Sequence, residues 1–184
     1  MISILLKENT KQLHDLVEAK FNSHRIFDGT FAMDDYKNLI QYNYLFLLNY
    51  ENTVFSAISH ENSKEIHLEQ RRKLALIEKD LEFLKIGTSS VQLPAVIKNE
   101  AEAFGILYVM EGATLGGNMI AKQLSRKPDF QEVTFRYFRC YDDKTGSYWK
   151  NFKEVMDRQI TQEFHADCIS GAKKAYGFLL DLSL

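Results

Sequence analysis

His14 is the residue whose type and surroundings most directly suggest chemistry, because a neutral imidazole is a common metal ligand in proteins. On a helical wheel of residues 3–22 it lies between an apolar arc and a charged arc that includes Lys7, Lys11 and Glu18. Glu18 follows His14 by four residues, so its carboxylate can orient the ring directly or through water. A metal-ligating histidine at the edge of a pocket is one interpretation of this pattern, although the spacing alone favours the other. The alternative is a helix-surface histidine with an incidental neighbour.

A second candidate is the glycine-rich stretch that contains Gly112, Gly116 and Gly117 and follows Gly105 along a helical pattern. A glycine inside a helix is less favourable than alanine by up to about 1 kcal/mol, so this crowding indicates a specific use. Close approach of the backbone to another helix or to a flat ligand is one explanation. The alternative is a helix end and a turn that joins two helices.

The remaining candidates have simpler explanations. The other four histidines have no partner at metal-ligand spacing, and the chain has no Glu-x-x-His pair, which argues against a ferritin-like di-iron site. Cys140 and Cys168 are too few and too far apart for a disulfide framework or a thiolate metal site. The charged run at residues 69–73 is expected to form a solvated helix face. An aromatic cluster is expected to be core or pocket wall: Tyr137, Phe138, Tyr141, Tyr148, Trp149 and Phe152.

Helices must position these residues, because apolar side chains recur at helical spacing along most of the chain. The predicted helices are residues 3–22, Asp34 or Asp35 to about Val54, Ser63–Leu84, Pro94 through Met110, Asn118–Leu124, Tyr148–Phe164 and Ala166–Leu182. The segment at residues 133–138 is expected to be a short extended or helical piece. No internal repeat or linker divides the chain, so residues 1–184 are expected to form one all-α domain.

The composition supports this fold class and excludes several functions. Only 2 prolines and 9 glycines occur in 184 residues, so the chain is not a low-complexity or turn-dense all-β protein. With 23 Lys and Arg against 25 Asp and Glu, the formal net charge is −2, which argues against binding of nucleic acid. The chain has neither a signal-peptide pattern nor an apolar run that could span a bilayer. A cytoplasmic protein that does not bind membranes is therefore expected.

Two segments together resemble the heme oxygenase family. The stretch from Leu6 to His14 resembles the helix of that family that supplies the proximal heme ligand, and the stretch from Tyr108 to Gly117 resembles the distal helix of its soluble bacterial branch. That branch includes enzymes that supply biliverdin to bacteriophytochromes. The downstream aromatic pattern is similar as well, and the parts occur in the same order over nearly the whole chain.

The resemblance implies a multi-helical bundle that holds heme b between a proximal helix and a kinked distal helix. It makes His14 the ligand to the iron, with Glu18 behind it. It places Gly112, Gly116 and Gly117 across the opposite face of the heme, with Thr114 as a possible anchor for water. The residues that it implies as partners of the heme propionates are Lys7, Lys11, Tyr108 and Lys173.

The reaction that the resemblance implies is oxidative cleavage of heme to biliverdin, iron and carbon monoxide. Dioxygen is the co-substrate, and the electrons come from a ferredoxin or a flavodoxin-type partner. The protein is expected to be a monomer or a weak homodimer. One departure is Ala113, which stands where the animal enzymes have a carboxylate. It motivates the alternative of a non-catalytic protein that binds or delivers heme. A thiaminase-like hydrolase is a third possibility, but neither cysteine has the carboxylate neighbours that it needs.

Overall fold

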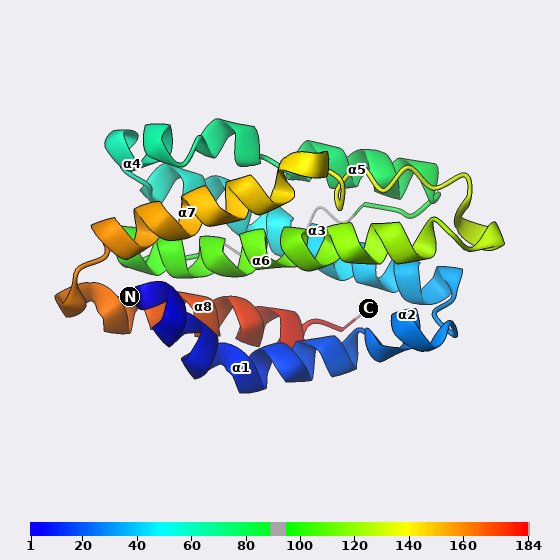
Figure 1. Cartoon of the computed structure of the whole chain (residues 1–184), viewed down its shortest axis with the longest axis horizontal. Coiled ribbons are helices and arrows are strands. Elements are labelled where there is room, and N and C mark those ends of the chain that lie inside the picture. Colours follow the sequence, from blue (N-terminus) through cyan, green and yellow to red (C-terminus); the bar gives the residue numbers. More distant parts are fainter. Residues whose placement is uncertain (89–94, 184) are drawn as a thin grey trace.

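The computed structural model describes residues 1–88 and 95–183, and this part of the chain is all-helical, as predicted (Figure 1). It contains eight α-helices: α1 (Ile2–Lys20), α2 (His24–Asp28), α3 (Met33–Ala57), α4 (His60–Glu65), α5 (Leu74–Phe83), α6 (Glu100–Leu124), α7 (Thr145–Gln159) and α8 (His165–Asp181). Short 3₁₀ turns are η1 (Leu68–Arg71), η2 (Pro128–Phe130), η3 (Asp142–Lys144) and η4 (Gln162–Phe164). Residues 133–138 form irregular backbone and turns.

The predicted helix Ser63–Leu84 is wrong, because the structure divides this segment into α4, η1 and α5. His67 lies between α4 and η1 and has a φ of +54°, a left-handed conformation that prevents one continuous helix. The predicted helix Tyr148–Phe164 is also shifted, since α7 spans Thr145–Gln159 and η4 follows it. Pro94 lies outside the described residues, and α6 begins at Glu100, where Asn99 Oδ1 accepts a hydrogen bond from the Glu102 amide at 3.0 Å.

Helix α6 runs through its glycines without interruption from Glu100 to Leu124. The interpretation of Gly112–Gly117 as a turn between two helices is therefore wrong. The glycines lie inside one helix, and they face different surroundings on its different sides.

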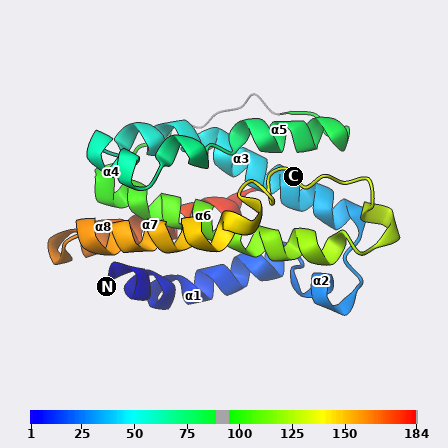
Figure 2. The same cartoon turned by 45° about the horizontal axis from the view of Figure 1, so that its top comes forward.

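Helix α6 lies at the centre of the molecule, with α8, α3 and α7 packed against it, and α1 packs on α8 and α7 (Figures 1 and 2). Two glycines allow α6 and α8 to approach closely. A Cβ on Gly105 would lie 1.9 Å from the carbonyl oxygen of Cys168, and a Cβ on Gly171 would lie 2.1 Å from that of Glu102. At Gly105 the predicted close backbone approach is thus an approach to another helix.

The core is rich in aromatic side chains. Of the predicted aromatic cluster, Tyr137, Phe138, Tyr141 and Phe152 are buried, and Tyr148 and Trp149 are partly buried. Tyr36 anchors a second group, in which Phe130 and Phe135 meet its ring edge-on at centroid distances of 5.8 and 5.3 Å. Among the described residues, none of the helices has the length and apolar character needed to cross a bilayer.

Candidate functional site

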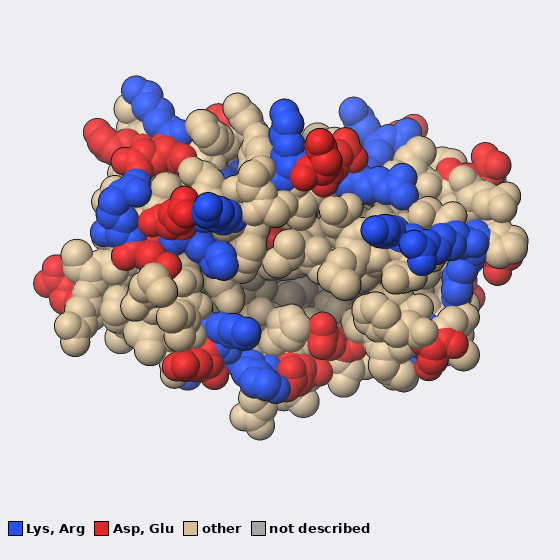
Figure 3. Space-filling view, viewed as in Figure 1, with Lys and Arg blue, Asp and Glu red and all other residues tan. Residues whose placement is uncertain are grey.

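A hollow lies between α1 and α6 near the middle of one face of the molecule (Figures 1 and 3). On the α6 side, a Cβ added to Gly112 or Gly116 would meet no atom within 4 Å, so both glycines face open space. Tyr108 precedes Gly112 by four residues and Gly116 follows it by four, which places the three on one stripe of the helix. Leu115 and Met119 flank this stripe and are 37% and 58% exposed. The α6 side of the hollow is therefore flat, apolar and uncovered.

On the α1 side, His14 is half exposed, and its ring meets the edge of the Tyr176 ring at a centroid distance of 6.1 Å. The Nδ1 atom lies 3.8 Å from carboxylate oxygens of both Glu18 and Asp15, which is too far for a direct hydrogen bond. A bridging water or a small side-chain rotation is needed before Glu18 can orient the ring. In the described part of the chain, these three residues are the single group of His, Cys, Asp and Glu side chains placed to share a metal ion.

Tyr176 of α8 connects the two sides of the hollow, and the sequence interpretation gave it no role. Burial raises the pKa of its hydroxyl well above the usual value; Tyr108 and Glu18 raise it further, and a hydrogen bond with Thr10 opposes them. The hydroxyl is therefore neutral at physiological pH and lies among groups of α1 and α6. The sequence contained a signal for Tyr176. It follows Lys173, a predicted partner of the heme propionates, by one helical turn and so lies on the same side of α8.

The predicted lysines lie on the surface of α1 and α8. Lys7 and Lys11 are exposed on α1, and Lys173 is exposed on α8. Figure 3 shows basic and acidic side chains alternating along the α1 edge of the hollow. Lys11 Nζ donates to Asp15 Oδ2 at 2.7 Å, and this hydrogen bond raises the pKa of Lys11. The ammonium group of Lys11 has two further donor hydrogens, so it can bind an anionic ligand beside Asp15 or in its place.

Two of the predicted site residues face away from the hollow. A Cβ on Gly117 would lie 2.0 Å from the ring of Phe138, so this glycine allows the ring to pack against α6. The hydroxyl of Thr114 is buried and donates to the carbonyl of Met110 at 3.2 Å. The glycines grouped by sequence thus divide between two sides of the helix.

Behind the glycine stripe lies a buried charged cluster, which we name the Glu111 network: Glu111, Arg71, Lys73 and Tyr141. The Glu111 carboxylate forms ion pairs with Arg71 and Lys73, and it accepts hydrogen bonds from the Tyr141 hydroxyl at 3.1 and 3.2 Å. All three charged side chains are at most 1% exposed. The prediction that residues 69–73 form a solvated face is therefore wrong for Arg71 and Lys73.

The Glu111 network holds several elements together. Arg71 also donates to the carbonyl of Ile66 at 2.6 Å, to the carbonyl of Tyr148 at 3.1 Å and to Asn151 Oδ1 at 3.2 Å. Burial disfavours the charged form of Glu111, but the cations of Lys73 and Arg71 outweigh burial and lower its pKa. The carboxylate is consequently ionised at neutral pH.

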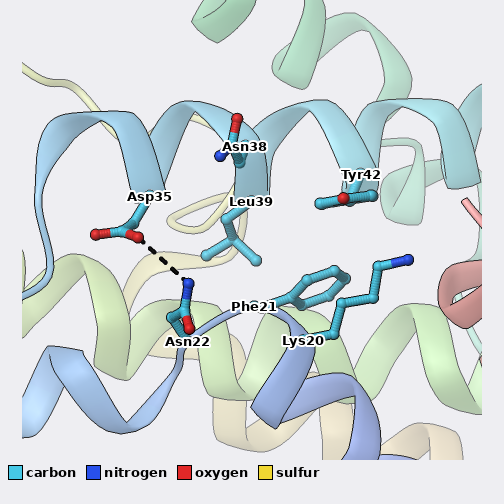
Figure 4. A pocket seen from close by; sticks show the side chains of 7 residues that line it. All are labelled: Lys20, Phe21, Asn22, Asp35, Asn38, Leu39 and Tyr42. Atoms are coloured by element: carbon cyan, nitrogen blue, oxygen red, sulfur yellow. Dashed lines mark hydrogen bonds between the residues drawn. The ribbon is translucent and has the colours of Figure 1, made fainter. Parts of the chain in front are cut away.

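The described part of the chain has two other hollows, and the second of them borders the Glu111 network at Tyr148 and Asn151. One, of about 70 Å³, is lined by Lys20, Phe21, Asn22, Asp35, Asn38, Leu39 and Tyr42 (Figure 4). In it the rings of Phe21 and Tyr42 stack at 5.1 Å, and Asn22 Nδ2 donates to Asp35 Oδ1 at 3.4 Å. The other, of about 410 Å³, is lined by His67, Gln70, Lys144, Ser147, Tyr148 and Asn151. Neither contains a predicted site residue, and the first is too small for a drug-sized ligand.

Comparison with known proteins supports the resemblance seen in the sequence. The profile of the Heme oxygenase family matches residues 1–183. A heme oxygenase from Xanthomonas campestris pv. campestris (strain 8004) is 29% identical over 107 residues, which are 58% of this chain. The match spans 64% of the length of that relative. The NO- and CO-bound crystal structure of heme oxygenase from Neisseria meningitidis has the same fold, with a TM-score of 0.77 over 97% of this chain and 88% of that one, at 23% identity.

Proposed function

Because the chain belongs to the heme oxygenase family, we propose that it binds heme b in the hollow between α1 and α6 and cleaves it oxidatively to biliverdin, iron and carbon monoxide. The observation that carries the proposal is the pairing of His14 on one side of the hollow with the uncovered Gly112 and Gly116 on the other. A flat macrocycle fits a surface from which side chains are missing, because the helix backbone can then approach one of its faces closely.

His14 ligates the iron in this proposal, and Glu18 and Tyr176 orient its ring from α1 and α8. The half-exposed position of His14 leaves its ring accessible to a ligand that enters the hollow. Bound heme supplies the redox chemistry, since it is both substrate and cofactor. The chain would supply the imidazole of His14 as the ligand to the iron and would fix the orientation of the heme.

The lysines hold the charged edge of the heme. Lys7, Lys11 and Lys173, together with the hydroxyl of Tyr108, bind the propionates. Charge-assisted hydrogen bonds of this kind fix the rotation of the macrocycle, which decides the meso carbon that is oxidised. Lys11 leaves Asp15 for a propionate, so its ion pair with Asp15 stands in for this contact when heme is absent.

The glycine stripe leaves room for dioxygen and ordered water. Ala113 adds only a methyl group beside Gly112, and the hydroxyl of Thr114 is bonded to Met110. Because the Thr114 hydroxyl already donates to Met110, the water is held by carbonyl oxygens near Gly112 and Gly116, each of which can accept a second hydrogen bond. Gly117 contributes by letting Phe138 pack behind the stripe.

The electron donor is an acidic protein of the ferredoxin or flavodoxin type, which the lysines around the hollow attract. The protein acts as a monomer or a weak homodimer. Salt dependence of turnover tests the first point, since ionic strength screens exposed charges. Sedimentation at micromolar concentration tests the second.

The experiment that tests the proposed function adds hemin and a reductant to the protein under air. We expect loss of the Soret band, a broad red absorbance and biliverdin on chromatography. His14→Ala should abolish the ligand spectrum of the heme complex, whereas Gln12→Ala, an exposed residue of the same helix, should not. A Soret band that persists in the wild type without ring opening would support the alternative that Ala113 motivates, a protein that binds or delivers heme.

A further inference from the structure

The Glu111 network lies directly behind the glycine stripe, and nothing in the proposed reaction uses it. Glu111 immediately precedes Gly112, and a step of one residue turns an α-helix by about 100°. Fixing the direction of the Glu111 side chain therefore fixes the direction in which Gly112 and Gly116 face. We propose that Glu111 is a positioning residue, which holds the rotation and helicity of residues 112–118 so that the glycines face the hollow. The inference rests on the proposed function.

The segment needs such an anchor because it has few others. Three of its residues are glycines, which weaken a helix, and two of these face open space. Its polar side-chain contacts to other elements are long, since Asn118 Nδ2 lies 3.4 Å from the carbonyl of Asp142 and from Thr145 Oγ1, and the hydroxyl of Thr114 bonds within α6 itself. The Glu111 carboxylate, by contrast, has two buried ion pairs and a hydroxyl donor.

The anchor is rigid because its partners belong to separate elements. Arg71 is held at the end of η1 by the carbonyl of Ile66 and by α7 through Tyr148 and Asn151. Lys73 is held at the start of α5, where its amide donates to Glu51 Oε2 at 2.6 Å. A carboxylate fixed from two directions cannot rotate about the axis of α6 without losing one cation.

The test uses Glu111→Gln/Lys73→Met, which removes one negative and one positive charge and so keeps the net charge of the network, with Arg71 still bonded to the carbonyls of Ile66 and Tyr148. In the heme-free protein, we expect hydrogen exchange of the amides of residues 112–118 to be at least about tenfold faster, while α8 changes by less than about twofold. Leu81→Ala, a fully buried change in α5, is the matched control for general loosening. The control variant should leave the difference in exchange rate between residues 112–118 and α8 as it is in the wild type.

A second readout uses the heme complex. Removing a side chain that orients a site commonly changes its properties by about 10- to 100-fold, so we expect faster release of carbon monoxide from the ferrous complex. The affinity for hemin, which depends on His14 and the lysines, should change by less than about twofold. A weaker affinity for hemin without a change in the rate of carbon monoxide release would contradict a positioning role.

Wild-type exchange at residues 112–118 and wild-type release of carbon monoxide would overturn the proposal and leave the network a purely structural one. If the double variant does not fold, Tyr141→Phe decides, since it removes one hydrogen bond to Glu111 and should speed local exchange by about fivefold; unchanged exchange would overturn the proposal. The exchange measurement needs no heme, so a failure of heme cleavage is seen separately.

Discussion

The two sides of α6 differ sharply over a few residues. The side that faces the hollow carries Gly112 and Gly116, whose absent side chains leave open space. The inner side carries Glu111, Thr114 and Gly117, all buried, with every charge paired and Phe138 packed against the backbone. Adjacent glycines, Gly116 and Gly117, thus have opposite surroundings. The difference teaches that one helix can leave open space on one side while ion pairs and packing fix its other side.

The two sides also differ in what stabilises them. The inner side buries charges, which is favourable only because Arg71, Lys73 and Tyr141 satisfy the Glu111 carboxylate together. The open side has the low helix propensity of glycine and no packing to offset it. We therefore expect substitutions on the inner side to lower stability, and substitutions on the open side to change function.

The largest effect is expected for Glu111→Gln, which leaves two buried cations facing a neutral amide. Breaking a buried ion pair from one side costs about 3–5 kcal/mol, so the free energy of unfolding should fall by that amount in chemical denaturation. Glu154→Gln is the control, because Glu154 pairs with Lys150 only at the surface and at 3.7 Å. It should change stability by less than about 0.5 kcal/mol. Equal losses of unfolding free energy for the two substitutions would show that the buried ion pairs of the inner side stabilise the protein no more than a surface pair does.

Acid should reduce the difference in stability between the wild type and Glu111→Gln. The pKa of Glu111 is lower in the folded protein than the ordinary value of 4.5, mainly because two cations outweigh its burial. Its contribution to stability is therefore complete above pH 4.5 and is lost as the pH falls through the folded pKa. The difference in unfolding free energy between wild type and Glu111→Gln should be constant from pH 7 to 5 and shrink below 4.5. A difference that grows in acid would contradict this assignment.

Gly117→Ala should have the next largest effect, because its Cβ would lie 2.0 Å from the Phe138 ring. Phe138 is 2% exposed and packs against Tyr137 at 4.9 Å, so it can move little. Overpacking of this kind costs about 1–3 kcal/mol, measured as a loss of unfolding free energy. Phe138→Leu in the Gly117→Ala background should recover part of the loss. If it recovers none, the methyl group clashes elsewhere.

Sequence reasoning identified the open side better than the inner side. The boundary position of His14 and the crowding of glycines are local patterns, and helical periodicity is enough to show them. Gly116 and Gly117 could not be told apart, because their difference depends on where Phe138 packs, 21 residues away in the sequence.

The Glu111 network was missed because its members are far apart in the chain. Arg71 and Lys73 lie in a run of charges that is typical of a solvated surface, and their partner is about 40 residues away. One signal was present: Glu111 is the only charged residue between Glu102 and Lys122, so a lone carboxylate in an apolar helix predicts a buried partner. The division of residues 63–84 was also hidden, since it depends on a left-handed His67.

Gly116→Ala should have the smallest effect on stability, and one of opposite sign. A Cβ on Gly116 meets no atom within 4 Å, so alanine should raise the unfolding free energy of the heme-free protein by up to about 1 kcal/mol. The same methyl group projects toward the proposed heme face and should slow heme cleavage while hemin still binds through His14. A loss of stability would show that the space is not open. If the variant is more stable and cleaves heme more slowly, the methyl group must act by entering the space that the reaction uses, since it does not disturb the helix. Higher stability with unchanged cleavage would instead show that heme lies elsewhere.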